Sequence, residues 1–219
     1  MREGHLPIDE PYHGVAQESL PAMTLLTPSE ERWREFVRNT ADAPPWPHLE
    51  RAAALFQKPG DALDVGAGGG RDTKHLLRHG WRVTAIDASP AAAEALHNLP
   101  LQHSLRVVVS AAENFAPATY DLVNAQYSLP FIARDHYDET VRRLRDSVRQ
   151  RGVMAATFFG TRDEWNVPGS QQTFSTRSDI ERLFARWDVI DLTEAEAEGH
   201  TADGTPKHWH VFHLIARRL

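Results

Sequence analysis

The chain of 219 residues contains no cysteine. This absence excludes disulfide bonds, thiolate zinc sites and a cysteine nucleophile, and it fits a reducing compartment. The sequence also has no run of 18 consecutive apolar residues, and its first residues show neither the basic start nor the apolar run of a signal peptide. We therefore expect a soluble, cytoplasmic protein with no membrane partner.

The sequence also lacks an excess of positive charge. It has 24 Lys and Arg against 30 Asp and Glu, which gives a formal net charge of -6. Nucleic-acid-binding proteins usually carry a basic patch or stripe, so we expect no nucleic-acid partner. The arginine-rich segment 142–151 has the spacing of a solvated helix face. No pattern predicts the oligomeric state.

The first part of the chain has little periodicity. Residues 1–26 contain three prolines, and we predict that they form a flexible N-terminal arm. Thr27 to Glu30 has the form of a capping box with proline at the first helical position, which predicts a helix over 29–40. A second helix is predicted over 48–58. The length suits one domain, 27–219, in which residues 27–58 form a helical lid.

From residue 62 onward, strands and helices alternate. Strands are predicted at 62–66, 81–87, 105–110, 120–126 and 152–160, and helices at 72–80, 89–99, 135–150 and 176–186. Such alternation implies a parallel sheet covered on both faces. Strands at 187–197 and 208–216 are joined by too short a connector for a crossover, so they should run antiparallel. The fold class is α/β: a doubly wound, mostly parallel sheet of seven strands.

A glycine-rich loop, LDVGAGGGRD at 63–72, lies between the first strand and a helix. Glycines let the backbone turn sharply and approach a ligand, while the helix start presents unpaired N–H groups. The dinucleotide pattern G-x-G-x-x-G fails from Gly66, because Arg71 takes the place of the third glycine. What fits is Asp64 followed by glycines at alternate positions. Asp87, which ends the second strand, supplies acceptors for a vicinal diol and would repel a 2'-phosphate, so NADP is a poor fit.

This pattern resembles the class I S-adenosylmethionine-dependent methyltransferases. The stretches GRDTKHLLRHGWRVTAIDAS, FFGTRDEW and KHWHVFH resemble the small-molecule enzymes of the tellurite-resistance and thiopurine type. The resemblance implies a Rossmann-like methyltransferase fold, with the last strand inserted beside the fifth. It also implies S-adenosylmethionine as cofactor, with the strand-one acid and the glycines at the methionine part, Asp87 at the ribose, and Ala112 and Glu113 at the adenine. The cofactor-binding residues so implied are Asp64, Gly66, Ala67, Gly68, Gly70, Asp87, Ala88, Ala112, Glu113 and Asn124.

The expected activity is transfer of a methyl group, by in-line displacement, to a small-molecule acceptor. The acceptor should lie beyond the carboxyl ends of the fourth and fifth strands and the start of the last strand. The predicted pocket residues are Trp33, Tyr127, Phe159, Arg162, Trp165 and His208. Tyr127 and His208 are the candidate catalytic residues, and ordinary packing is the alternative for each.

Three histidines, His208, His210 and His213, fall within six positions of the last strand. Successive strand residues point to opposite faces, and His213 lies about 16 Å from His208 along the strand. The three histidines cannot meet at one ion, and we predict no metal site. His208 lies nearest to the expected pocket, so it is the candidate base.

Two other functions fit part of the pattern. An NAD-dependent oxidoreductase should show the third glycine and a second mononucleotide-binding half. The second is a non-catalytic protein with the cofactor fold, serving in binding or regulation, and the intact Asp64, Gly66, Gly68 and Asp87 count against it. The segment SLPF at 128–131 resembles the N-P-P-[YF] motif of amino-group methyltransferases that act on nucleic acid, but it lacks the Asn-Pro pair.

Overall fold

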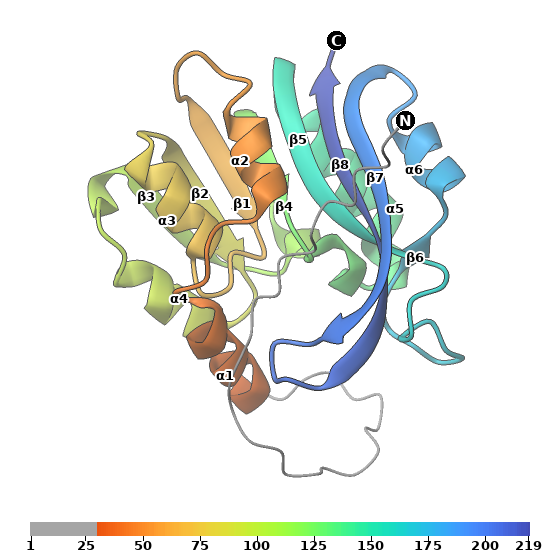
Figure 1. Ribbon diagram of the computed structural model, residues 1–219. Helices are drawn as coiled ribbons and strands as arrows, with labels where there is room; N and C mark the ends of the chain where they lie inside the picture. Colours follow the sequence, from red (N-terminus) through yellow and green to blue (C-terminus); the bar gives the residue numbers. More distant parts are fainter. Residues whose placement is uncertain (1–29) are drawn as a thin grey trace, which may run out of the picture.

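The computed structural model describes residues 30–219 (Figure 1). The predicted arm, and the capping box at the start of the first predicted helix, therefore lie outside the described residues. Within the described part, no helix is both long enough and apolar enough to cross a membrane.

One twisted sheet forms the centre of the molecule, with strand order β3-β2-β1-β4-β5-β8-β7. Strands β1 to β5 are parallel, and β8 lies antiparallel between β5 and β7. This order confirms the predicted fold class, including the last strand beside the fifth. The strands are β1 Asp61–Val65, β2 Arg82–Asp87, β3 Leu105–Val109, β4 Tyr120–Ala125, β5 Val148–Gly160, β7 Trp187–His200 and β8 Pro206–Arg218, with a short β6 Phe174–Ser175 beside β5.

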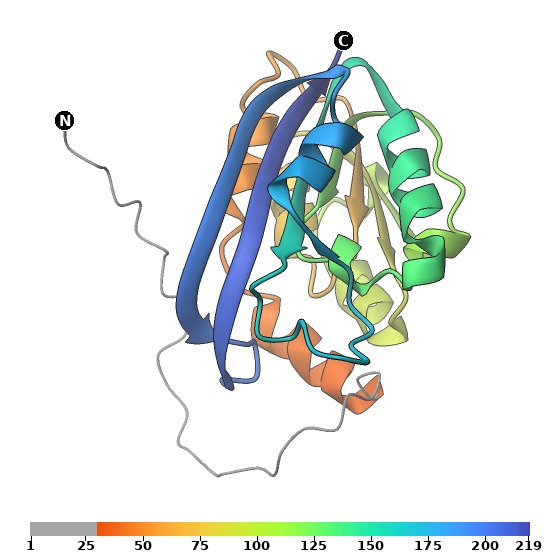
Figure 2. The ribbon, with the colours of Figure 1, turned by 90° about the vertical axis from the view of Figure 1, so that its right-hand side faces the viewer.

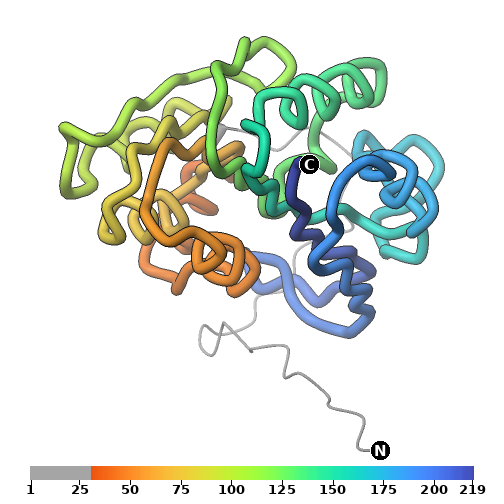
Figure 3. Tube along the Cα trace, turned by 90° about the horizontal axis from the view of Figure 1, so that it is seen from above, coloured from red at the N-terminus to blue at the C-terminus, as the bar shows by residue number. Residues whose placement is uncertain are grey.

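Helices cover both faces of the sheet (Figure 3), and each face has its own hydrophobic core. On one face, α2, α3 and α4 pack on strand residues such as Leu122 and Ala155. On the other, α5 and α6 pack on Val123 and Phe158. Neighbouring strand residues thus serve opposite cores, as pleated strands require. The helices are α1 Glu30–Thr40, α2 Pro47–Ala53, α3 Arg71–Arg78, α4 Pro90–His97, α5 Arg134–Asp146 and α6 Arg177–Leu183, with 3-10 turns η1 Gln102–Ser104, η2 Ala112–Asn114 and η3 Leu129–Phe131.

Two predicted helices are too long. The helix predicted to end at residue 150 ends at Asp146, because Val148 is fully buried and pairs with Tyr120 as the first residue of β5. Arg151 then takes a left-handed conformation, with φ +66°, where the register of β4 and β5 shifts. The helix predicted over 48–58 ends at Ala53, and Phe56 beyond it packs edge-on against Trp81.

Strands β7 and β8 are longer than predicted and extend past the rest of the sheet (Figure 2). They pair from Trp187 and Arg218 to His200 and Pro206, whereas β8 pairs with β5 only over residues 211–217. We call residues 196–210 the hairpin arm. Its tip reaches α1, where Arg32 lies 3.1 Å from the Asp203 carboxylate and Asn39 donates to the Ala202 carbonyl. The arm and α1 therefore meet at the carboxyl edge of the parallel strands.

Candidate functional site

The glycine loop is tightly enclosed by its neighbours. Gly66, Gly68 and Gly70 all have positive φ, which favours glycine. A Cβ on Gly66 would lie 2.5 Å from the Ser128 Cβ, and one on Gly69 would lie 2.6 Å from the Val37 carbonyl oxygen of α1. The loop therefore requires glycine both for its conformation and because η3 and α1 approach it so closely.

Asp87 is joined directly to this loop. Its carboxylate accepts hydrogen bonds from the Gly68 N–H at 2.9 Å and the Ser89 N–H at 2.8 Å. Burial raises the pKa of Asp87, and these two bonds oppose the shift. Each carboxylate oxygen keeps a further lone pair. Asp87 can therefore accept two more hydrogen bonds, as a vicinal diol would supply.

Asp64 is buried beneath the loop and bonded within the protein. Its two oxygens accept hydrogen bonds from the Thr73 hydroxyl at 2.6 Å and the Asn124 amide at 2.9 Å. Asn124 also donates to Asp72, at 2.8 Å. Burial raises the pKa of Asp64 to about 7, and the nearby Asp72 charge adds to the shift. Asp64 and Asn124 thus tie β1, β4 and α3 together under the loop.

A chain of buried side chains continues from Asn124 across the sheet. The Gln126 amide donates to Asn124, and the Thr157 hydroxyl donates to Gln126. Because the Thr157 proton is used in this way, Thr157 must accept from His213 Nδ1–H, 3.2 Å away. Burial lowers the pKa of His213 to about 3, and its ring stacks on His48. We call this set the buried polar chain; it links His213 to the carboxylates under the glycine loop.

The expected adenine side is formed by the turns after β2 and β3. Ala88 is exposed, while Ala112 and Glu113 are half-buried in η2. Sequence reasoning did not identify Arg143 of α5, which donates to the carbonyls of both Ala112 and Glu113 and so fixes this turn. No local motif indicates such a long-range contact.

Two buried hydroxyls near the loop have no hydrogen-bond partner within residues 30–219. They belong to Ser89, which follows Asp87 by two positions, and Ser128, which contacts Gly66. Buried polar groups in proteins are usually paired, so unpaired ones need a reason. Together with Asp87, these hydroxyls fit a polar cofactor lying across the glycine loop.

Aromatic side chains gather at the carboxyl edge beside the loop. Trp33 contacts Phe131, which contacts Phe159 and Trp165, and both of these contact Trp209. Tyr127 lies against Phe159, Trp209 and Trp46. The structure therefore brings four predicted pocket residues together. We call the full set the aromatic cluster: Trp33, Phe36, Trp46, Tyr127, Phe131, Phe159, Trp165 and Trp209.

His208 and Arg162 lie outside this cluster. His208 is 2.7 Å from Glu198 and 3.1 Å from Glu196, while Arg162 pairs with Glu194 and Glu196. The carboxylates of Glu198 and Glu196 raise the pKa of His208. Strand alternation places the next residue, Trp209, in the cluster instead. The expectation that His208 and Arg162 face the acceptor is therefore corrected, because their side chains lie on the opposite face of the hairpin arm.

Lys207 shares the inner face with Trp209, and sequence reasoning missed both. The Lys207 ammonium is almost fully buried, lies 3.6 Å from the Trp209 ring centre and pairs with Asp163 at 2.5 Å. The signal was available in the alternation of β8, since residues 207 and 209 must oppose His208 and His210. Within the described residues, no group of three His, Asp or Glu side chains is arranged to hold a metal ion.

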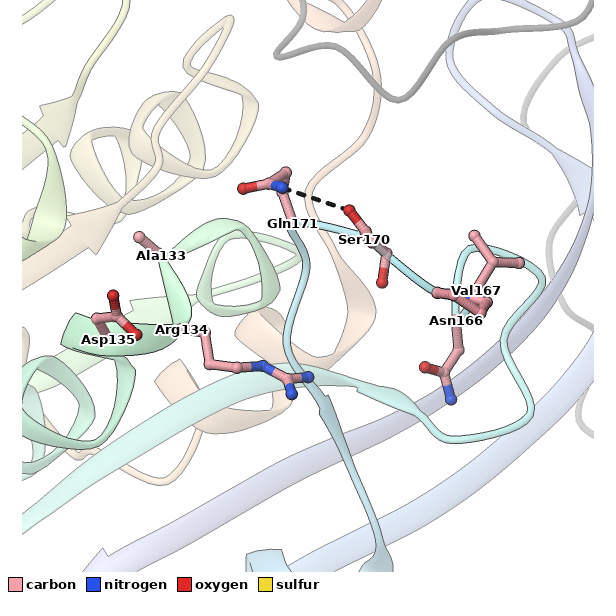
Figure 4. A pocket seen from close by; sticks show the side chains of 9 residues that line it. Ala133, Arg134, Asp135, Asn166, Val167, Ser170 and Gln171 are labelled. Atoms are coloured by element: carbon pink, nitrogen blue, oxygen red, sulfur yellow. Dashed lines mark hydrogen bonds between the residues drawn. The ribbon is translucent and has the colours of Figure 1, made fainter.

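A separate cavity of about 620 Å³ lies between the first turn of α5 and the loop that follows Trp165 (Figure 4). It contains no predicted site residue. In Figure 4 the Arg134 side chain extends toward the loop that carries Asn166. The lining residues are Ala133, Arg134, Asp135, Asn166, Val167, Pro168, Gly169, Ser170 and Gln171.

Comparison with known proteins agrees with this geometry. A family model described as a methyltransferase domain matches residues 63–154, from β1 through the start of β5. Over this span the chain resembles a methyltransferase domain, and its sheet has the Rossmann-like methyltransferase fold. The matched span contains the glycine loop, Asp87 and the 112–124 segment.

Similar proteins include the ubiquinone biosynthesis O-methyltransferase of Sodalis glossinidius, 32% identical over 118 residues, which are 52% of this chain and 45% of that protein. The solved structure of TehB from Haemophilus influenzae is 16% identical, with a TM-score of 0.67 over 78% of this chain and 61% of that one. The 1,6-didemethyltoxoflavin-N1-methyltransferase of Burkholderia thailandensis is 21% identical, with a TM-score of 0.61 over 95% and 99%. The chain spans about half the length of the curated relatives it matches.

Proposed function

We propose that this protein is a methyltransferase that transfers a methyl group from S-adenosylmethionine to a small-molecule acceptor. The observation that carries the proposal is the junction of Asp87 with the glycine loop through the Gly68 N–H. This junction sets a carboxylate that can accept two further hydrogen bonds, as from a ribose diol, beside the glycine loop. The unpaired hydroxyls of Ser89 and Ser128 support the same ligand position.

The cofactor residues divide into two groups. Asp87, the loop from Gly66 to Gly70, Ala88 and the turn at Ala112 and Glu113 would border the cofactor. Asp64 and Asn124 would act from below by holding the loop, since their polar atoms are bonded within the protein. When bound, the cofactor supplies an activated methyl group: the acceptor lone pair bonds to its carbon while the carbon–sulfur bond breaks, which leaves S-adenosylhomocysteine.

We infer that the aromatic cluster aids the reaction by positioning the acceptor and excluding water, and not by supplying a general base. Burial raises the pKa of the Tyr127 hydroxyl, so it stays protonated at neutral pH. The Lys207 ammonium is paired with Asp163. We infer that the acceptor loses any proton to water, before or after transfer, and that alignment and exclusion of water supply most of the rate.

The class of acceptor and the cellular location are proposed from separate observations. Two similar proteins are named for methylation in ubiquinone biosynthesis and of 1,6-didemethyltoxoflavin, which supports a small molecule. The net charge of -6 argues against nucleic acid. The cysteine-free composition is consistent with a cytoplasmic location.

Calorimetric titration with S-adenosylhomocysteine and with NAD tests this function. We expect binding of the former only, and Asp87→Ala should weaken it by about tenfold or more, because two hydrogen bonds to a carboxylate are lost. Asp188→Ala, at an exposed position on β7, is the matched control. Binding of NAD alone would favour the oxidoreductase. Binding of S-adenosylhomocysteine without methylation of thiophenol, catechol, aniline or selenite would favour a regulatory protein.

A further inference from the structure

The aromatic cluster is continuous and touches the glycine loop at both ends. At one end, a Cβ on Gly68 would lie 3.4 Å from the Phe36 ring, and Phe36 contacts Trp33. At the other end, Tyr127 directly precedes Ser128, which contacts Gly66. Between these ends the rings pass through Phe131, Trp165 and Trp209. The cluster therefore borders the glycine loop, where the proposed function places the cofactor.

The rings come from separate parts of the chain. They belong to α1, the segment before α2, the β4–η3 junction, the end of β5 with its following loop, and the hairpin arm. Only Phe159 is fully buried, while Phe131 is 38% exposed and Phe36 is 37% exposed. A hydrophobic core hides its rings, whereas this set remains partly open at the site. Concave ligand sites are typically lined by such aromatic side chains.

The contacts between the rings leave faces available. Most pairs meet edge to face; for example, Tyr127 and Trp209 cross at 86° and Phe131 and Phe159 at 76°. An edge-to-face contact uses the face of one ring only. Lys207 covers one face of Trp209 and of Trp165, and the exposed parts of Phe131 and Phe36 remain accessible to a ligand. Gly199, opposite Lys207 in the hairpin arm, has no side chain, and a Cβ there would lie 3.1 Å from Trp209. This glycine lets the Trp209 indole pack closely against the backbone of β7.

Two cations lie against the rings of the cluster. Lys207 lies over the rings of Trp209 and Trp165 and pairs with the buried Asp163 carboxylate, and the Arg71 guanidinium lies 4.2 Å from the Trp46 ring centre. A small inorganic oxyanion or an aliphatic ammonium would have to compete with the contacts that these groups already make, or remain unpaired in an aromatic surrounding, and both are costly. A flat apolar ring carries no charge, so its binding has no such cost in free energy.

We propose that the methyl acceptor is a planar aromatic or heteroaromatic small molecule, stacked against the rings of the aromatic cluster. This proposal rests on the proposed function, because it assumes that the cofactor lies on the glycine loop. The nucleophilic atom is then a substituent or ring atom directed at the loop between Phe36 and Tyr127.

Ligand binding tests the ring preference separately from chemistry. Benzamide and 2-naphthamide would be compared with their reduced counterparts, cyclohexanecarboxamide and decahydronaphthalene-2-carboxamide, by saturation-transfer NMR and by tryptophan fluorescence, with S-adenosylhomocysteine present. We expect the planar amides to bind about tenfold more tightly. Trp165→Leu and Trp209→Leu should remove this preference, whereas Trp187→Leu, in contact with Phe184 at the far end of β7, should keep it. Phe131→Leu, at a partly exposed position, serves if the tryptophan variants do not fold.

The same samples separate the two proposals. Absence of S-adenosylhomocysteine binding overturns the proposed function and this inference with it. Normal S-adenosylhomocysteine binding with equal affinity for planar and reduced amides overturns the acceptor class alone. Methylation of selenite in preference to thiophenol would also overturn it. A planar preference that is lost on Phe131→Leu and kept on Trp187→Leu supports it.

Discussion

At the scale of single residues, strand alternation decides which side chains of β8 can act on a substrate. His208 faces Glu196 and Glu198, while Lys207 and Trp209 face the aromatic cluster. We expect His208→Ala to leave S-adenosylhomocysteine affinity and turnover within about twofold of the parent, as is usual for surface positions away from special features. Initial rates with the best of the four probe acceptors would measure this, and Trp209→Leu, which should lower turnover, is the matched comparison. A large fall in kcat for His208→Ala would contradict this prediction and show that His208 acts in the site.

The sequence was informative about residues in local motifs. Asp64, the alternating glycines and Asp87 meet around one loop, because a strand, a tight turn and a helix start are local events; that they bind a cofactor stays a prediction. Arg143 could not be predicted, since its contact with the 112–113 turn joins residues about 30 positions apart. The inner face of β8 was predictable in part: alternation separates Trp209 from His208, but only the structure shows which face meets the cluster.

At the scale of elements, α1 forms a cover over the glycine loop. The Val37 carbonyl of α1 and Ala41, which directly follows α1, lie too close to Gly69 to leave space for a side chain there. Gly69→Ala should displace α1, at a cost of about 1–3 kcal/mol in the free energy of unfolding. Hydrogen exchange should then be faster in residues 30–40, and S-adenosylhomocysteine should bind more weakly.

Helix α5 provides the internal control for this variant. It lies on the other face of the sheet, so exchange in residues 134–146 should stay unchanged. Unchanged protection of α1 in Gly69→Ala would show that the helix is not held against the loop. The prediction of a helical lid over 27–58 stays a prediction; the contact of α1 with Gly69 and with the tip of the hairpin arm supports it.

The length of the hairpin arm illustrates what the pattern of elements leaves open. Alternating residues such as Glu194, Glu196 and Glu198 indicate an extended strand with one solvated side. They do not show where the partner strand ends, and the sequence of the turn at 201–205 does not determine the register between β7 and β8. Cross-strand pairs such as Glu198 with His208, together with the contact of Asp203 with Arg32, fix it in the structure.

At the scale of the whole molecule, the strand order followed from the alternation of elements and the short last connector. The ends of α2 and α5 could not be predicted in this way. Residues 54–58 and 147–150 have helical composition, but burial of Val148 against β4 outweighs local propensity. The long-range pairing of the sheet therefore sets element boundaries that the local sequence does not.

The buried polar chain connects both halves of the sheet and makes a prediction about pH. Asp64, at one end, has a raised pKa, so its contribution to stability is present below about 3.8 and is lost as the pH rises through about 7. His213, at the other end, has a lowered pKa, so its contribution is present above about 6.5 and is lost as the pH falls toward 3. Between pH 4 and 6.5 the two slopes have opposite signs and offset each other.

A single substitution at each position should reveal how much that side chain contributes to the pH dependence of the free energy of unfolding. Relative to the parent, Asp64→Asn should gain stability as the pH rises from 4 to 7, and His213→Gln should lose it, each by at most about 1.4 kcal/mol per pH unit. Asp72 and His48 are left unsubstituted in both variants, so each measured slope includes the response of the neighbouring group. Thermal unfolding across this pH range measures the differences. Parallel profiles for the parent and both variants would contradict the prediction, because they would mean that neither buried group changes its proton affinity on folding.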